Sequence, residues 1–284
     1  MSHKPKHHHF RLADLPMDRK LSRKDYDEKL AGLHRKLQAI QQAYLVSGDR
    51  AIVVFEGWDA GGKGGAIRRM TSVMDPRSCH VWPIGAPTDR EQGKHYLFRF
   101  WQRLPDPSSI AIFDRSWYGR VMVERVEGLA SREEWTRAYH EIAEFERMLI
   151  DDGVRIVKLF LHITPEEQLE RFRKRLEDPL KRWKLSYEDL RNRQKWDDYV
   201  GAIEEMIDRT STAAAPWTAI PANDKDYARI AAIETVVETL SRGVDLSPRP
   251  ISPDLARVAR EALGLDLPVE KEDEPGKAMG QGRG

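Results

Sequence analysis

The stretch FEGWDAGGKGG (residues 55–65) places five glycines within nine residues, between a short apolar run and a helical pattern. The apolar run, 51–55, is rich in Val and Ile, which is typical of a strand buried on both faces of a parallel sheet. Gly57 followed by Gly62-Lys63 has the spacing of a phosphate-binding loop. Glycines let backbone amides turn toward an anion, and the N-terminus of the following helix adds partial positive charge. We therefore predict a phosphate-binding loop, with a Gly-rich turn that binds nothing as the less favoured alternative.

The loop departs from the general pattern at one position. Gly64 stands where Ser or Thr usually supplies a hydroxyl that helps to hold Mg²⁺. A carboxylate inside the loop, Asp59, would repel phosphate unless a divalent cation bridges the two. Asp114 ends a later strand pattern, where phosphate-loop enzymes keep a metal-directed acid. We predict a metal site at Asp59 and Asp114; Asp59 acting as a base on the acceptor phosphate, or only capping a turn, are the alternatives.

Strand and helix patterns alternate along the rest of the chain. Apolar runs rich in β-branched residues predict strands, and apolar residues at three- and four-residue spacing predict helices. Expected strands cover 51–55, 79–84, 109–113, 154–163 and 216–222; expected helices cover 22–46, 63–74, 89–103, 132–150, a segment from 164, and 225–240. Such alternation is typical of an α/β fold, a parallel sheet with helices on both faces, in which ligands bind at the carboxyl ends of the strands.

The domain organisation follows from local composition. Residues 1–20 are basic, His-rich and without periodicity, so we expect a flexible N-terminal arm. No internal repeat is evident, so residues 21–242 are expected to form a single domain. The stretch 243–284 is rich in Pro, Gly and charge, which predicts a partly disordered tail with one short helix over 253–263.

The overall composition argues against several kinds of partner. A net charge of +1 gives no overall field that favours nucleic acid or a membrane surface. Cys79 is the only cysteine, so an intrachain disulfide is excluded. No apolar run approaches the ~20 residues that span a bilayer, and residues 1–15 lack the apolar core of a signal peptide. We therefore expect a cytoplasmic protein that binds neither nucleic acid nor membranes.

A second motif, FDRSWYGRVMVERVEG over 113–128, surrounds Asp114. Arg115 and Arg120 follow this acid, and two arginines there suit phosphoryl transfer, in which the equatorial oxygens need fixed positive charge. If the segment turns into a short helix, Arg120 and Glu124 lie one turn apart. A surface ladder of Arg–Glu pairs is the alternative interpretation.

A third cluster is basic and contains a proline. Seven Lys or Arg residues fall between Arg171 and Lys184, against only two acids, and Pro179 interrupts the helical pattern. A basic, hinged segment after a strand suits a lid that closes over phosphates and excludes water, which would otherwise hydrolyse the phosphoryl group. A solvated basic helix is the alternative. We expect a lid at about 171–200 whose phosphate-binding residues are Arg173, Arg175, Lys181 and Arg182.

Together these motifs resemble the polyphosphate kinase 2 family. The shared stretches are FEGWDAGGKGG, GAPTDRE, FDRSWYGRVMVERVEG, DPLKRWKLS, KWDDY and APW, in order across 50–242. The resemblance implies a P-loop kinase fold with a helical lid, which moves phosphoryl groups between inorganic polyphosphate and nucleotides with Mg²⁺. It also implies that glycine at position 64, in place of Ser or Thr, is typical of the family. The residues that the resemblance implicates in catalysis are Asp59, Lys63, Asp114, Arg115 and Arg120. It implies that Asp59 and Asp114 bind Mg²⁺ (or Mn²⁺). The residues that it implicates in binding phosphate or nucleotide are Gly57, Ala60, Gly61, Gly62, Gly64, Gly65 and Glu124.

The resemblance further implies which substrates to expect. Trp58 and Gly119 are similar to the branch that phosphorylates nucleoside monophosphates, so transfer from polyphosphate to AMP, giving ADP, is the favoured reaction. Transfer to ADP, or reverse synthesis of polyphosphate, is the alternative on the same site. An ATP-dependent nucleotide kinase and a non-catalytic polyanion-binding protein are weaker alternatives. The family also implies a homodimer or homotetramer.

Overall fold

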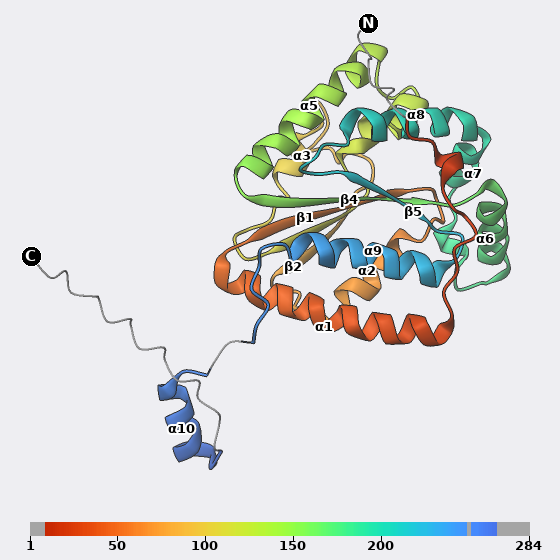
Figure 1. Cartoon of the computed structure of the whole chain (residues 1–284). Coiled ribbons are helices and arrows are strands. Elements are labelled where there is room, and N and C mark those ends of the chain that lie inside the picture. Colours follow the sequence, from red (N-terminus) through yellow and green to blue (C-terminus); the bar gives the residue numbers. More distant parts are fainter. Residues whose placement is uncertain (1–8, 249–250, 266–284) are drawn as a thin grey trace, which may run out of the picture. The chain divides into compact units, whose positions relative to one another are not determined.

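Five parallel strands form the central sheet of the computed structural model, which describes residues 9–248 and 251–265 (Figure 1). Their order across the sheet is β2-β3-β1-β4-β5. The central strand is buried on both faces, as a strand with parallel neighbours on each side requires. The expected strands and parallel sheet are confirmed, with the bounds β1 (Arg50–Gly57), β2 (Cys79–Pro83), β3 (Ile110–Asp114), β4 (Val154–His162) and β5 (Trp217–Pro221).

Helices cover both faces of this sheet. Figure 1 shows α1, α2 and α9 on one face and α3, α5 and α8 on the other. The α/β class with helices on both faces is therefore confirmed. The helices of the domain are α1 (Arg23–Ser47), α2 (Lys63–Thr71), α3 (Phe98–Trp101), α4 (Val123–Val126), α5 (Arg132–Asp151), α6 (Pro165–Glu177), α7 (Tyr187–Gln194), α8 (Trp196–Thr210) and α9 (Lys225–Leu240), with the short 3₁₀ helices η1 (Leu12–Asp14), η2 (Trp117–Arg120) and η3 (Arg182–Lys184) between them.

Local signals set the ends of several helices where the sequence predicts them. The side chain of Ser22 accepts a hydrogen bond from the backbone of Asp25 and begins α1, and Gly48 ends it in the left-handed conformation. Thr164 begins α6 in the same way, with Pro165 in the first turn. Because α6 starts directly after β4, it carries the segment that is predicted to form a lid beyond the carboxyl end of the sheet.

The expected helix over 89–103 is wrong for most of its length. Residues 89–97 form turns, and only α3 near its end is helical. The buried Glu91 is the cause, because it accepts a hydrogen bond from the backbone of Thr88 and pairs with both Arg99 and Arg103. These bonds fold the chain back on itself, whereas a continuous helix would place Glu91 and Arg103 roughly three turns apart.

The N-terminal segment from His9 onward is fixed to the domain, contrary to the expectation of a flexible arm. The backbone N–H of Phe10 donates to Asp208 at 2.8 Å, and that of Leu12 donates to Glu204 at 2.8 Å. Leu12 is 2% exposed and belongs to the hydrophobic core. The anchoring carboxylates lie on α8, so no pattern within the arm itself predicts them. Residues 1–8 of the expected arm lie outside the described residues.

Residues from Ser247 form a second unit, close to the expected boundary at 242. The expected short helix is confirmed as α10 (Pro253–Leu263), which Ser252 caps and Gly264 ends. The expected disorder of the tail falls mainly on 266–284, outside the described residues. Within the described ranges, no helix is long and apolar enough to cross a membrane.

A buried ion pair fixes the chain that follows β3. Lys158 of β4 donates to Glu146 at 2.7 Å, to the hydroxyl of Tyr118 at 3.0 Å and to a backbone carbonyl of α8 at 2.7 Å. Glu146 also accepts hydrogen bonds from Trp117 and Tyr118. All three ammonium protons are thus bonded, which offsets the cost of burying the pair. The network holds η2, and so the backbone between the two predicted arginines, in one place.

Candidate active site

The phosphate loop has a backbone conformation that its glycines permit. Gly57 has a φ of +144°, and Gly62, the residue before α2, has a φ of +109°. A Cβ atom at Gly57 would lie 2.5 Å from the carbonyl oxygen of Leu161 on the neighbouring strand β4. Both the φ value and the close approach therefore require glycine at this position.

We expect Gly57→Ala to destabilise the domain by at least ~2 kcal/mol, because the new Cβ adds overpacking to a disfavoured φ. Gly64→Ala is the matched control, since no described atom outside its chain neighbours and its own helix backbone lies within 4 Å of the added Cβ, and alanine favours a helix. Urea unfolding of both variants measures the difference. Equal stability of the two would contradict the requirement for glycine at residue 57.

Lys63 lies within the phosphate loop. The residue is buried, and its Nζ donates hydrogen bonds to the carbonyl oxygens of Gly57 at 2.7 Å and Trp58 at 3.2 Å. The ammonium group is therefore already where the loop would meet a phosphate. Of the seven residues predicted to bind phosphate or nucleotide, Gly57, Gly64 and Glu124 do not line the cavity beside the loop; those that line it are Ala60, Gly61, Gly62 and Gly65.

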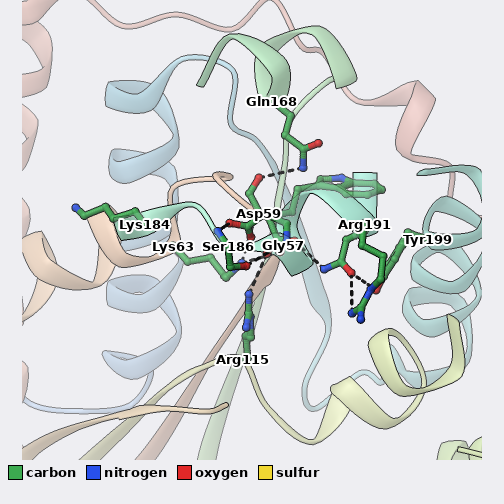
Figure 2. A network of polar contacts seen from close by, with 12 residues as sticks. Gly57, Asp59, Lys63, Arg115, Gln168, Lys184, Ser186, Arg191 and Tyr199 are labelled. Atoms are coloured by element: carbon green, nitrogen blue, oxygen red, sulfur yellow. Dashed lines mark hydrogen bonds and ion pairs between the residues drawn. The ribbon is translucent and has the colours of Figure 1, made fainter. Parts of the chain in front are cut away.

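Asp59 is the centre of a hydrogen-bonded network (Figure 2). Its Oδ1 accepts from Nη2 of Arg115 at 2.9 Å, and its Oδ2 accepts from Nδ2 of Asn192 at 3.0 Å. Burial alone would raise the pKa of Asp59, but the charges of Lys63 and Arg115 outweigh it and hold the pKa below the ordinary value. The structure thus brings three predicted catalytic residues together, an anion with two cations, beyond the ends of β1 and β3.

Asp114, the second predicted metal ligand, ends β3 in register with Phe55 of β1. Its half-buried side chain makes no hydrogen bond or ion pair with other residues of 9–248 and 251–265. In the same ranges no group of three or more His, Cys, Asp or Glu residues is placed to hold a metal ion. Mg²⁺ is often held by one or two carboxylates together with substrate phosphates and water. Asp59 and Asp114, at the ends of adjoining strands, fit that donor set.

The second predicted arginine lies in a separate cluster. Arg120, at the end of η2, pairs with Glu124 at 3.1 Å, one turn further along the chain, as the spacing predicts. Its guanidinium lies over the ring of Tyr96, 4.6 Å from the centroid. Burial raises the pKa of Glu124, although the charges of Arg120 and Arg99 oppose the shift. Among the described residues, Arg120 makes none of these contacts with Asp59 or the phosphate loop.

A basic cavity of about 340 Å³ adjoins the phosphate loop. Its walls come from the loop, from α6 and the segment after it, and from α9. Burial and then the charge of Arg171 lower the pKa of Lys225, as expected where cations crowd together. Such a surface favours an extended polyanion. Among the described residues that line it, none is Asp or Glu and seven are Lys or Arg: Arg171, Lys174, Arg175, Lys181, Lys184, Lys225 and Arg229.

The predicted lid residues divide between this cavity and its surroundings. Arg175 and Lys181 line the cavity, whereas Arg173 and Arg182 do not. Arg173 is exposed, and Arg182 donates to a backbone carbonyl of α6. No motif in the sequence indicates the two lining cations of α9, Lys225 and Arg229, because this helix lies far along the chain and only the folded sheet brings it beside α2.

Trp58 connects the loop to the helices beyond the sheet. Its ring stacks on that of Trp196, with centroids 3.6 Å apart and planes 4° from parallel. Its Nε1 donates to Nδ1 of His162 at 2.9 Å. Burial lowers the pKa of His162 to about 4, so the ring is neutral at pH 7 and can accept this bond. No signal in the sequence links these three residues, which lie far apart along the chain.

The neutral His162 predicts a loss of stability in acid. In the unfolded chain the imidazole has its ordinary pKa of 6.5 and binds a proton that the folded protein does not bind until about pH 4. The free energy of unfolding should be largest above pH 6.5 and fall by up to about 3 kcal/mol as the pH falls to 4. His162→Gln keeps an acceptor for Trp58 but does not titrate, so urea unfolding at pH 7 and 4.5 should show a smaller loss. An equal loss in both proteins would exclude His162 as the cause.

The parallel sheet, the glycine-rich loop before α2 and the basic segment after β4 together define a P-loop kinase-like protein. That class includes enzymes with many different substrates, and similarity to known sequences distinguishes the families within it. The polyphosphate kinase 2 (PPK2) family matches residues 20–245, and the chain belongs to this family.

Known proteins of this kind are similar over most of the chain. Polyphosphate:AMP phosphotransferase of Pseudomonas aeruginosa is 46% identical over 229 residues, 81% of this chain and 46% of that protein. ADP-polyphosphate phosphotransferase 2 of Rhizobium meliloti is 43% identical over 220 residues, 78% of this chain and 72% of that protein. The crystal structure of polyphosphate kinase 2 from Arthrobacter aurescens TC1 has a TM-score of 0.81 at 33% identity, covering 88% of this chain and 92% of that one. The chain spans about half the length of the polyphosphate:AMP phosphotransferases that it matches.

Proposed function

We propose that this chain is a polyphosphate-dependent nucleotide kinase, which transfers the terminal phosphoryl group of inorganic polyphosphate to a nucleotide. The observation that carries the proposal is the basic cavity beside the phosphate loop, whose walls, within 9–248 and 251–265, contain seven cations and no carboxylate. A nucleotide carries only a short phosphate chain, whereas a polyphosphate chain can meet the cations of α6 and α9 together. Membership of the PPK2 family supports the same donor.

We infer that AMP is the favoured acceptor and ADP the product. Similarity to the polyphosphate:AMP phosphotransferases supports this choice, and so do Trp58 and Gly119, the two residues that resemble the monophosphate-using branch. Transfer to ADP, or its reverse, is the second candidate, because a relative of nearly equal identity is an ADP-polyphosphate phosphotransferase.

In the proposed reaction an oxygen of the acceptor's phosphate attacks the terminal phosphorus of polyphosphate. The bond from that phosphorus to the bridging oxygen breaks, and polyphosphate leaves one phosphate shorter. The backbone amides of the 57–65 loop and the N-terminus of α2 would bind the acceptor phosphate. Lys63 would exchange its bonds to loop carbonyls for bonds to phosphate oxygens. Arg115, which precedes η2, and Arg120, at the end of η2, would stabilise the charge in transit.

Asp59 and Asp114 would hold Mg²⁺, or Mn²⁺, together with oxygens of the substrates. When bound, the cation would neutralise phosphate charge. No hydrogen bond or ion pair with another described residue occupies the carboxylate of Asp114, which supports this role, and the negative charge on Asp59 supports it as well. The lid segment after β4 would exclude water, so that the phosphoryl group reaches the nucleotide and is not lost to hydrolysis.

The test is an assay with polyphosphate and Mg²⁺ in which AMP and ADP are offered separately and products are resolved by chromatography. We expect ADP formation from AMP with a higher kcat/KM than ATP formation from ADP. A preference for ATP as the donor would instead indicate an ATP-dependent nucleotide kinase. Tight binding of RNA without phosphoryl transfer would indicate a non-catalytic polyanion-binding protein.

Lys225→Ala should raise the KM for polyphosphate by ~10-fold, because a charge-assisted hydrogen bond contributes ~1.5–3 kcal/mol. Loss of one phosphate contact should also make the plot of log affinity for polyphosphate against log salt concentration shallower, by about one unit of slope. Arg173→Ala is the matched control, since it removes one positive charge from the lid outside the cavity. Steady-state kinetics at several salt concentrations measure both effects, and equal effects of the two substitutions would argue against the cavity as the donor site.

A further inference from the structure

Three consecutive residues of the phosphate loop are each held by a side chain from the segment 165–196, which carries the lid. Trp58 stacks on Trp196, the carboxylate of Asp59 accepts from Asn192, and the carbonyl oxygen of the next residue accepts from a buried arginine of α6 at 2.8 Å. Only the contact between Asn192 and Asp59 reaches a side chain of the proposed catalytic set. A movement of α7 would therefore change the surroundings of this carboxylate directly.

The amide of Asn192 can face Asp59 in one orientation only. An ionised carboxylate accepts hydrogen bonds but cannot donate them, so Nδ2 of Asn192 must point toward it. The oxygen at the opposite end of the amide accepts hydrogen bonds: Oδ1 lies 3.3 Å from the donating hydroxyl of Tyr199 and 3.4 Å from the donating Nη2 of Arg191. Figure 2 shows Arg191 and Tyr199 on one side of Asp59 and Arg115 on another.

The helix α7 also reaches the backbone of Asp59 by a second route. Arg193 donates to the carbonyl oxygen of Pro165 at 2.7 Å and to Oε1 of Gln168 at 3.1 Å. The other end of that amide, Nε2 of Gln168, donates to the backbone carbonyl of Asp59 at 3.1 Å. Adjacent residues of α7 thus hold the side chain and, through Gln168, the main chain of one loop residue.

We propose that Asn192 is a positioning residue for Asp59, and that it links the position of α7, in the predicted lid segment, to the orientation of this carboxylate. The inference rests on the proposed function, in which Asp59 holds the cation. Asn192 is a neutral donor that keeps Oδ2 turned away from Arg115. Without it, both oxygens of Asp59 are available to the guanidinium, and a bidentate Arg–carboxylate pair competes with a cation. Groups that orient a metal ligand are typically worth ~10–100-fold in metal affinity or activity.

Asn192→Ala should therefore raise the Mg²⁺ concentration needed for half-maximal activity by ~10-fold or more, and lower kcat at saturating Mg²⁺ far less. Gln194→Ala is the matched control, because Gln194 is exposed on the same helix and its side chain makes no hydrogen bond with other described residues. A loss of kcat with an unchanged Mg²⁺ requirement would overturn the proposal, since it would indicate only a structural role.

Two readouts do not depend on activity. Mn²⁺ alone, titrated into each protein and followed by electron paramagnetic resonance, should bind ~10-fold more weakly to Asn192→Ala than to wild type or Gln194→Ala. Hydrogen exchange of the amides of 187–194 should be faster in Asn192→Ala, because the link that closes α7 is lost. Unchanged Mn²⁺ affinity or unchanged exchange would each overturn the inference. If wild type transfers nothing from polyphosphate, the proposed function fails, while these two measurements still decide the role of Asn192.

Discussion

Arg115→Ala is expected to lower kcat for phosphoryl transfer by ~10³-fold or more, the effect typical of a charge-stabilising arginine. The side chain of Arg115 is 52% exposed and reaches Asp59 at 2.9 Å, so it lies at the phosphate loop without forming part of the core. Its loss should change the free energy of unfolding by no more than ~1 kcal/mol. Steady-state kinetics at saturating polyphosphate, with thermal unfolding measured in parallel, separates a loss of catalysis from a loss of structure.

The backbone at Arg115 calls for controls of its own, because its φ of +67° lies in the left-handed region. Arg115→Gly removes the side chain and adopts this φ without strain, so its activity should match that of Arg115→Ala. Arg115→Lys keeps the charge but loses the planar fork, and it should recover only part of the rate. If a variant without the guanidinium keeps more than about a tenth of wild-type kcat, the assigned role is wrong.

Asp59→Asn is expected to remove most Mg²⁺-dependent activity, with kcat/KM falling by ~10²-fold or more. The substitution preserves the size of the side chain and an acceptor for Arg115, but it removes the negative charge that attracts a cation. It also brings one amide donor against another at Asn192, where the carboxylate now accepts. A Mg²⁺ titration of activity measures the change, and an unaltered titration would exclude Asp59 as a ligand.

Two companion variants test the same metal assignment. Asp114→Asn should increase the Mg²⁺ requirement in the same direction as Asp59→Asn, because each removes one carboxylate from the predicted pair. Gly64→Ser restores the hydroxyl of the general phosphate-loop pattern, yet it should neither alter the Mg²⁺ requirement nor rescue Asp59→Asn. Rescue by Gly64→Ser would show that the metal lies at the usual hydroxyl position.

Local sequence patterns were sufficient to predict most of the sheet and the glycine-rich loop. The five strands are short apolar runs, and burial on both faces of a parallel sheet makes such runs recognisable without any partner. The loop is recognisable because its glycines and Lys63 are contiguous in the chain. The pairing of Arg120 with Glu124 was predictable because the two residues are only four apart, although the structure places them in η2 and α4, on either side of a turn, and not in one helix.

Predictions failed where a distant or irregular partner decided the conformation. The helix over 89–103 does not form, because Glu91 bonds to two arginines that a helix would hold apart. The arm from His9 is ordered, because carboxylates of α8 and the core hold it. The positive charge of the predicted lid segment was evident from the sequence. The sequence did not indicate which of its cations face the cavity, because no local pattern distinguishes one exposed basic residue of a helix from another.

By itself the sequence determined the five strands, the α/β class, the glycine-rich loop and the family, because periodicity and contiguous motifs carry that information. Only the tertiary structure decided that α9 supplies cations to the cavity, that Trp58 stacks on Trp196, and that Asn192 reaches Asp59. Each of these contacts joins side chains from separate elements. Hydrogen bonds and ring stacking act over a few ångströms, so such partners are set by how the helices pack beyond the sheet and not by their spacing in the chain.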